Sequence, residues 1–353
     1  MLKKKIKYVF SLGRYKQIIL SLLREENAKP LNTKKQYSYI KKNLKIYEGS
    51  NIDLLQGKNK KKIFYIINRT PGSGLFSNVN FVLNQLLICK KSKFIPIIDM
   101  ENYKTIYNEN KKIFNTYNAW EYYFKKLNKY KLEDVYKSKN IIIKNKNQRI
   151  KFQMSNKIFD KYKNKIIPHF RFKTLSHKFI EKNFNKNDKI LGIHFRGTSY
   201  KTAVGHALPP TPKIMSEFTD SLIKKYKYTK IFLVTEETKY LNFFKKKYKN
   251  KCYYLNSFRS KNNEAFKIYP RKLHRYRLGA ETLVEALVLS KCNGLAYIKS
   301  NLISAAIFFS SFKQNKHEIF LGFNSRNKFT ARWLWYLKSI LPKNFGGLKI
   351  IKN

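Results

Sequence analysis

The feature that most constrains the fold is a strand, turn, helix and strand pattern in the first third of the chain. Residues 62–67 form a short apolar run rich in β-branched and aromatic side chains, and residues 94–99 form a second. Such runs are typical of buried strands. Between them lie a turn with two glycines, Gly72 and Gly74, and a helical pattern over residues 75–89. This succession is a βαβ unit, and it predicts a parallel sheet.

A second α/β series begins near residue 188. Apolar runs predict strands at 188–195, 230–235 and 295–298, and helical patterns cover 213–226, 239–248, 281–290 and a stretch from 301. Residues 102–152, between the two series, have too little pattern to predict an order of elements. Two such series predict an α/β protein with two Rossmann-like, doubly wound domains.

The expected organisation has four parts. A basic segment, residues 1–60, contains one helix around 15–24, and a C-terminal packing helix and tail occupy 326–353, with the helix around 332–337. Between them we expect an N-terminal domain at 61–185, on the acceptor side, and a C-terminal domain at 186–325, which binds the donor.

Composition excludes several classes of protein. With 43% hydrophobic and 16% aromatic residues among 353, the chain is a folding one. The three cysteines, Cys89, Cys252 and Cys292, lie far apart without a CxxC pattern, which argues for a reducing compartment and against disulfides or structural zinc. No apolar run approaches the roughly 20 residues of a membrane span, and residues 18–23 are too short an apolar core for a signal peptide. We therefore expect a cytoplasmic protein.

The net charge of +54 leaves two interpretations open. Lysine is dispersed along the chain beside abundant Asn, Ile and Tyr, which is typical of an AT-rich genome filling exposed positions. No helix-turn-helix, zinc finger or aromatic RNP motif is present, so we expect no specific nucleic-acid partner. Peripheral contact with an anionic membrane, at the inner face of the plasma membrane, is the other interpretation.

Polar residues follow the strand that ends at residue 195. His194 and Arg196 are two apart and so share one face of the strand, and Gly197 then leaves room for a ligand near the backbone. Ligands of open α/β sheets bind where the strands end, and the planar fork of arginine suits a diphosphate. Alternatively, Arg196 pairs with a loop carboxylate. Only 21 acidic residues face 75 basic ones, which favours the ligand.

Three further segments carry candidate binding residues. Ser300 or Asn301 begins the helix after strand 295–298, either as a cap alone or as an anion site. Thr235 and Glu236 end the strand 230–235 and suit ribose hydroxyls or the orientation of an arginine. Glu285 is the carboxylate of an otherwise apolar helical run; it lies either on the surface or where it can pair with the N1–H and exocyclic amine of guanine.

Together these segments resemble the donor domain of the fucosyltransferase superfamily. The resemblance is nearest to the α1,6-fucosyltransferases of nodulation and N-glycan core type, and protein O-fucosyltransferases and α1,2-fucosyltransferases are further off. It covers about residues 189–311 and rests on four matches in the family's order: His194-Phe195-Arg196, Thr235-Glu236-Glu237, Glu285 and Ser300-Asn301. The loop with Gly72 and Gly74 is a weaker match to the family's glycine-rich first loop.

The resemblance implies a GT-B fold, with two domains facing across a cleft, and an inverting, metal-independent glycosyltransferase. It implies GDP-fucose or a related GDP-sugar as donor, a glycan acceptor and, for a bacterial enzyme, surface polysaccharide or lipooligosaccharide synthesis. Arg196 would hold the diphosphate, His194 and Glu285 would contact guanosine, and Ser300 with the next amide would bind phosphate.

The general base does not transfer from the family. Gly197 stands where the family often has a second arginine, and Val204 stands where the α1,6 enzymes place a glutamate. His206, close by, is our candidate, since a histidine near neutrality suits deprotonation of a hydroxyl; packing within its proline-rich loop is the alternative.

Other functions stay open at this point. One is transfer from another nucleotide sugar, such as GDP-heptose, GDP-mannose or a UDP-sugar. The others are a basic nucleic-acid- or membrane-binding protein without catalysis, and a donor-domain relic that acts as a membrane-bound scaffold.

Overall fold

The computed structural model describes residues 56–143, 151–259 and 265–351. The helix expected around residues 15–24 lies outside them. The described residues divide into two compact units, with the division between residues 152 and 153. The sequence predicts a boundary after residue 185, but helix α5 (Phe170–Asn183) packs against helix α8 (His274–Leu289) of the second unit. Residues 153–185 therefore belong to the second unit.

The first unit contains a parallel sheet of three strands in the order β2-β1-β3. Its elements are β1 (Lys58–Ile67), α3 (Leu75–Lys91), β2 (Ile95–Ile98), α4 (Leu132–Tyr136) and β3 (Ser138–Ile143). The predicted βαβ unit is confirmed by β1, α3 and β2. Strand β3 and helix α4 lie in the stretch whose order the sequence did not predict.

Alternation along β1 explains how helices cover both faces of this sheet. Phe64 and Ile66 are buried on one face with Val135 and Tyr136, at the end of α4. Tyr65 points to the opposite face, where its hydroxyl donates a 2.8 Å hydrogen bond to Gln85 of α3. Helices α4 and α3 therefore cover opposite faces, and this explains the continuous apolar run of β1.

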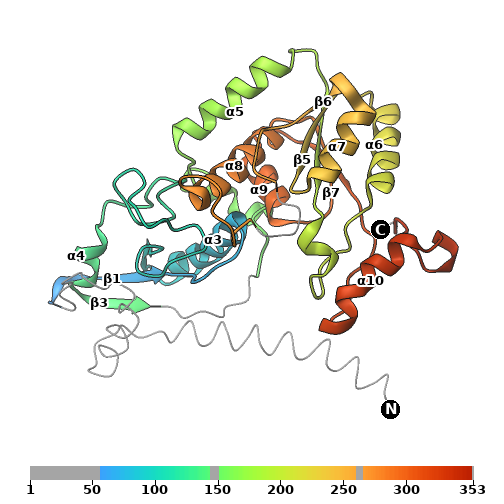
Figure 1. Ribbon diagram of the computed structural model, residues 1–353. Coiled ribbons are helices and arrows are strands. Elements are labelled where there is room, and N and C mark those ends of the chain that lie inside the picture. The colour runs from blue at the N-terminus through green and yellow to red at the C-terminus, as the bar shows by residue number, and fades with distance from the viewer. Residues whose placement is uncertain (1–55, 144–150, 260–264, 352–353) are drawn as a thin grey trace. The chain divides into compact units, whose positions relative to one another are not determined.

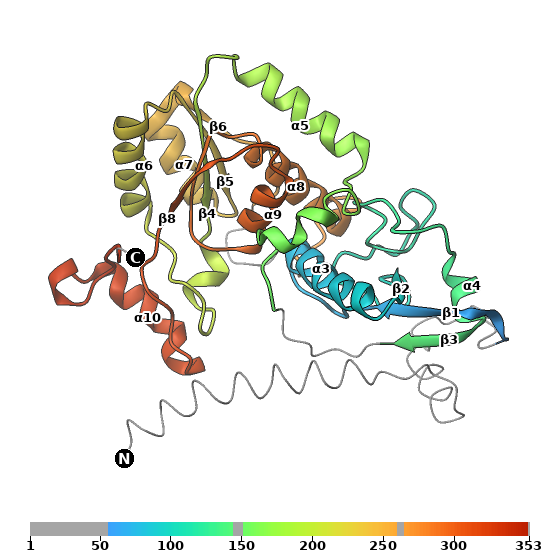
Figure 2. The same cartoon turned by 180° about the vertical axis from the view of Figure 1, so that it is seen from behind.

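The second unit contains a five-stranded parallel sheet in the order β6-β5-β4-β7-β8. Its strands are β4 (Ile190–Phe195), β5 (Lys230–Thr235), β6 (Cys252–Tyr253), β7 (Gly294–Tyr297) and β8 (Asn315–Glu318). Its helices, besides α5 and α8, are α6 (Pro212–Tyr226), α7 (Thr238–Tyr248), α9 (Asn301–Phe309) and α10 (Lys328–Ile340). Short 3-10 helices occupy Lys157–Tyr162, Thr198–Lys201, Lys249–Lys251 and Lys343–Phe345. Helices α6 and α7 lie on one face of the sheet, and α5, α8 and α9 lie on the other (Figures 1 and 2).

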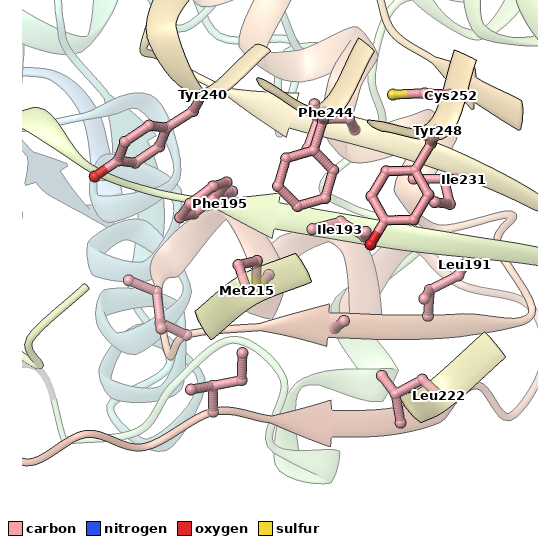
Figure 3. Close-up of a cluster of buried hydrophobic side chains, with 14 of the residues drawn as sticks. Leu191, Ile193, Phe195, Met215, Leu222, Ile231, Tyr240, Phe244, Tyr248 and Cys252 are labelled. Carbon is pink, nitrogen blue, oxygen red and sulfur yellow. The ribbon is translucent and has the colours of Figure 1, made fainter. Parts of the chain in front are cut away.

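The face beneath α6 and α7 holds a hydrophobic core (Figure 3). Leu191, Ile193 and Phe195 of β4 point into it, and the ring of Phe195 stacks on that of Tyr240 at 4.1 Å between centroids. The alternate residues of β4 therefore face α8 and α9. One of them is Gly192, where an added Cβ would lie 2.7 Å from Leu289 of α8.

The strand order fixes where a ligand would bind. From β4 the chain moves outwards to β5 and β6, and it then returns to place β7 and β8 on the other side of β4. The strand order therefore reverses between β4 and β7, and in open α/β sheets the crevice at such a point, beyond the strand ends, binds the ligand. The predicted α/β class, with two doubly wound parallel sheets, is confirmed.

Candidate functional site

His194 and Ser300 meet at this switch point. They are 106 residues apart in sequence, and His194 Nδ1 lies 3.2 Å from the Ser300 hydroxyl. Both side chains are buried. Burial, with a smaller effect from the charge of Arg196, lowers the pKa of His194 to about 3, so its imidazole is neutral at physiological pH. His194 therefore positions the Ser300 hydroxyl and adds no positive charge.

Ser300 caps helix α9. Its hydroxyl accepts a 3.3 Å hydrogen bond from the amide of Ile303, and its φ of −155° and ψ of 161° are those of an extended cap residue. The first amides of a helix have no partner within it, so the amides of Asn301 and Leu302 point out of the helix end. These amides and the helix dipole favour an anion. The predicted cap is thus confirmed, and the anion site at the same helix end stays a prediction.

Arg196 follows the last residue of β4, at the same edge of the sheet at which Ser300 follows β7. Its Nη2 atom lies 3.7 Å from Glu236 Oε2, and both side chains are about one-third exposed (33% and 32%). Its guanidinium also lies 4.6 Å from the centre of the Tyr200 ring. Arg196 is therefore paired with a carboxylate of the next loop, as the alternative interpretation of this arginine predicts. A role of Arg196 or Glu236 in ligand binding stays a prediction.

The next acid, Glu237, has a structural partner. Its carboxylate accepts hydrogen bonds of 2.8 and 3.1 Å from Lys201 in a mostly buried ion pair. The amide of Glu237 donates to the hydroxyl of Thr235, which is buried at the turn after β5. Thr235 therefore shapes the turn that carries the two acids.

Gly197 is needed for packing. An added Cβ would lie 2.0 Å from the Glu237 carboxylate and 2.8 Å from the ring of Tyr240. The sequence predicts room for a ligand at this glycine, but in the structure the space beside it holds Glu237, which pairs with Lys201. The absence of a side chain at Gly197 thus leaves space for the buried ion pair of Lys201 and Glu237 next to it.

Glu285 is buried in α8, which excludes the surface alternative. One carboxylate oxygen accepts a 2.7 Å hydrogen bond from Ser257, and no other described residue donates to this carboxylate. Burial raises the pKa of Glu285, and the net value is about 7. The hydrogen bond from Ser257 and the charge of Arg259 oppose this rise, and the charges of Glu281 and Glu236 add to it by smaller amounts.

The raised pKa of Glu285 predicts that the free energy of unfolding depends on pH. Folding raises the pKa of Glu285 from 4.5 to about 7, so between those values the folded protein holds a proton that the unfolded chain releases. Its contribution to the free energy of unfolding therefore falls as pH rises through that window. For Glu285→Gln, which cannot ionise, we expect the melting temperature relative to wild type to be higher at pH 8 than at pH 5. Equal differences at both pH values, or the same pattern in the exposed Glu318→Gln, would contradict this reasoning.

His206 lies in the loop after β4, and its side chain is exposed. Its ring lies 4.8 Å from the ring of Tyr200, which also stacks on Arg196. Although the side chain is exposed, the protein around it removes part of the water from the imidazole, and this, with a smaller effect from the charge of Arg196, lowers the pKa of His206. The imidazole is therefore neutral, and able to accept a proton, at physiological pH. His206, the candidate base, and Arg196 therefore both lie against the ring of Tyr200.

Gly72 and Gly74 lie in the first unit, in the loop between β1 and α3. Gly72 has a φ of +74°, which glycine adopts readily, and an added Cβ there would lie 2.8 Å from Asn78 Oδ1. Gly74 is the residue before α3. The amide of Ser73 donates to Asn78 Oδ1, which closes the turn. A local structural requirement therefore explains Gly72.

The sequence did not predict the loop after β6 as part of the candidate site. Ser257 donates to Glu285, and Arg259 donates to the carbonyl oxygens of Ser257 and Leu255. Arg271, which precedes α8, and Glu281, in the middle of that helix, form a bidentate pair. The signal was weak because β6 has only two residues, so no apolar run marked the strand end that carries Ser257 and Arg259.

The described residues contain neither a candidate metal site nor a candidate membrane span. No group of three or more His, Cys, Asp and Glu side chains there has an arrangement that could hold a metal ion. In the same part of the chain, no helix has both the length and the apolar character needed to cross a bilayer.

Comparisons with known proteins find similar solved structures. No protein-family model and no curated protein sequence matches the chain. NodZ α1,6-fucosyltransferase soaked with GDP-fucose is 12% identical, with a TM-score of 0.48, over 70% of this chain and 93% of that one. Fucosyltransferase NodZ from Bradyrhizobium is 11% identical, with a TM-score of 0.42, over 70% and 94%. POFUT1 in complex with GDP-fucose is 9% identical, with a TM-score of 0.42, over 77% and 99%.

Proposed function

We propose that the protein is a glycosyltransferase that moves fucose, or a related sugar, from a GDP-sugar to a hydroxyl of a glycan acceptor. One observation carries the proposal. At the switch point of the second sheet, Arg196 follows β4 and the capped N-terminus of α9 follows β7. An arginine fork and a helix N-terminus at the same crevice are the groups that suit a nucleotide diphosphate.

Guanine is the proposed base because of Glu285. A carboxylate can accept from both the N1–H and the exocyclic amine of guanine. Uracil has one N–H between two carbonyl oxygens, and adenine has no N1–H. Glu285 keeps an oxygen to which no described residue donates. GDP-fucose, present in the similar POFUT1 structure, is therefore the first donor to test.

The proposed reaction is a single displacement at the anomeric carbon. The acceptor oxygen forms a bond to that carbon from the face opposite GDP, and the bond to the diphosphate oxygen breaks, so the configuration inverts. His206 takes the proton of the acceptor hydroxyl. Arg196 and the start of α9 stabilise the negative charge that grows on the departing GDP, and this stabilisation lowers the barrier.

The setting is part of the proposal. We propose synthesis of a bacterial surface polysaccharide or lipooligosaccharide, at the inner face of the plasma membrane. The excess of 75 basic over 21 acidic residues supports contact with anionic head groups.

Turnover of GDP-fucose in EDTA tests the reaction. The resemblance implies no metal, and Arg196 with the start of α9 would supply the positive potential at the diphosphate. We expect release of GDP, with transfer to a mixed glycan acceptor pool, at the same rate with EDTA as without it. Loss of turnover in EDTA that Mn²⁺ or Mg²⁺ restores would contradict the metal-independent mechanism.

A further inference from the structure

Helix α10 is fixed to the second unit by one of its sides. Ala331 and Trp335 are four residues apart, so they lie on the same side of the helix, and both are buried. The indole of Trp335 donates a 2.7 Å hydrogen bond to the carbonyl oxygen of Pro209. In Figures 1 and 2 the helix lies at the border of this unit, apart from the helices that cover the sheet. Ala331 and Trp335 therefore mark the side of α10 that packs on the protein.

The opposite side of α10 is apolar and exposed. Its large side chains are Phe329, Trp333, Tyr336, Leu337 and Ile340. Their spacing along the sequence places them on one stripe of the helix, about 100° wide, which points away from the buried side. Trp333 is 64% exposed and Ile340 is 80% exposed. We refer to these five residues as the α10 stripe.

The α10 stripe reverses the usual pattern of a helix at the surface of a globular protein. Such a helix turns its apolar side to the core and its polar side to water. The helical spacing of the stripe is fixed from its first residue, since the side chain of Asn327 accepts hydrogen bonds from the amides of Phe329 and Thr330. Single exposed apolar side chains are ordinary, but a contiguous exposed patch marks an interaction site. The stripe is therefore a surface that a partner covers.

The charge of the C-terminal region limits what that partner is. Residues 319–353 include seven Lys and Arg and no Asp or Glu. Lys343 lies 3.9 Å from Glu217 of α6, in an exposed pair that offsets little of this charge. A second copy of the chain and the basic segment at residues 1–60 are positively charged too, and this region would repel them. An anionic partner is therefore indicated.

The side chains of the α10 stripe favour a lipid surface among anionic partners. The phosphates of a nucleic acid would pair with the lysines but would leave the five apolar side chains in water. A helix that has Trp, Phe and Leu on one side and Lys and Arg around them lies in the interface of a bilayer. Trp and Tyr are enriched at the level of the head groups. A bilayer with anionic lipids thus matches both the apolar stripe and the positive charge.

We propose that α10 attaches the protein to an anionic bilayer, with the α10 stripe inserted among the head groups. With 13 residues, the helix is about 20 Å long, which is too short to cross a hydrocarbon core of about 30 Å. It therefore lies in the plane of the surface. This inference rests on the membrane setting of the proposed function, for which it names the surface that makes the contact, and it does not depend on the donor.

The test uses the full-length protein with vesicles of equal parts phosphatidylglycerol and phosphatidylcholine, and with vesicles of phosphatidylcholine alone. Of the three tryptophans, Trp120 and Trp335 are buried and Trp333 is exposed, so a blue shift of the tryptophan emission reports insertion of the stripe. We expect wild type to bind the anionic vesicles with this shift, and the neutral ones at least ~tenfold more weakly. High salt should weaken the binding without abolishing it, because salt does not screen the apolar contact.

Leu337→Gln combined with Ile340→Gln shortens the α10 stripe and keeps Trp333 as the reporter. We expect this double variant to bind the anionic vesicles at least ~tenfold more weakly, since binding scales with the apolar area that is buried. The matched control is Phe170→Gln combined with Leu175→Gln in α5, at side chains that are 80% and 53% exposed, as Ile340 and Leu337 are. The control should bind as wild type does, and both double variants should melt normally. If the first melts at a lower temperature, Ile340→Gln alone should melt normally and still bind more weakly.

Several outcomes would overturn the inference. Unchanged binding by the α10 variants, or binding by wild type that high salt abolishes, would assign the contact to charge alone and leave the membrane setting in place. An equal loss in the α5 control would show that the stripe has no special role. A wild type that sediments as a dimer, beside a monomeric double variant, would assign the stripe to a second copy. Failure of wild type to bind anionic vesicles would overturn the membrane setting as well, whereas the donor assignment is tested separately by GDP binding.

Discussion

Arg196→Ala is expected to lower turnover by about 10²- to 10³-fold and to leave the melting temperature almost unchanged. The small effect on stability follows from the contact with Glu236, which is 3.7 Å long and about one-third exposed on each side. Such pairs contribute about 0–1 kcal/mol. The large effect on turnover follows from the role at the diphosphate, because removing one preorganised donor to a developing charge typically costs about 2.7–4 kcal/mol of barrier.

Arg196→Lys separates charge from geometry. Lysine keeps the positive charge but loses the planar fork and its stacking on Tyr200, so we expect turnover between those of wild type and Arg196→Ala. Arg332→Ala, at an exposed arginine of α10, is the matched control and should turn over normally. An Arg196→Ala protein that melts normally and keeps more than about a tenth of wild-type turnover would contradict the role at the diphosphate.

The second large effect that we expect is selectivity for guanine. GDP should bind at least ~tenfold more tightly than UDP or ADP, since a site built for a hydrogen-bonding partner rejects a ligand that lacks it. Glu285 can accept hydrogen bonds from both the N1–H and the exocyclic amine of guanine only when its carboxylate is ionised. Its pKa is about 7, so the affinity for GDP should fall as pH is lowered from 8 to 6, whereas that for UDP should change little.

The buried part of the fold was predictable from the sequence. Strands β4 and β5 lie inside the sheet with both faces covered, so each is an unbroken apolar run that ends where polar residues begin. That boundary identified Arg196 and Glu236. Strand β8 could not be found in this way, because at the sheet edge it reads Asn-Lys-His-Glu and is mostly exposed. Strand β6 is too short to make a pattern.

The pairings within the site were less predictable. The contact of His194 with Ser300 joins residues 106 positions apart, which no local pattern encodes. The sequence also does not show that Glu237 pairs with Lys201 while Glu236 pairs with Arg196. The two acids are adjacent in sequence, and only the turn after β5 points their side chains in different directions. Both facts depend on tertiary packing.

Calorimetric titration of the protein with GDP, UDP and ADP at pH 8 tests the central claim most directly. We expect GDP to bind at least ~tenfold more tightly than the other two. We also expect Glu285→Gln to lose most of this preference while it keeps its affinity for UDP. Equal affinity for the three nucleotides, or tighter binding of UDP, would contradict the assignment of a GDP-sugar as donor.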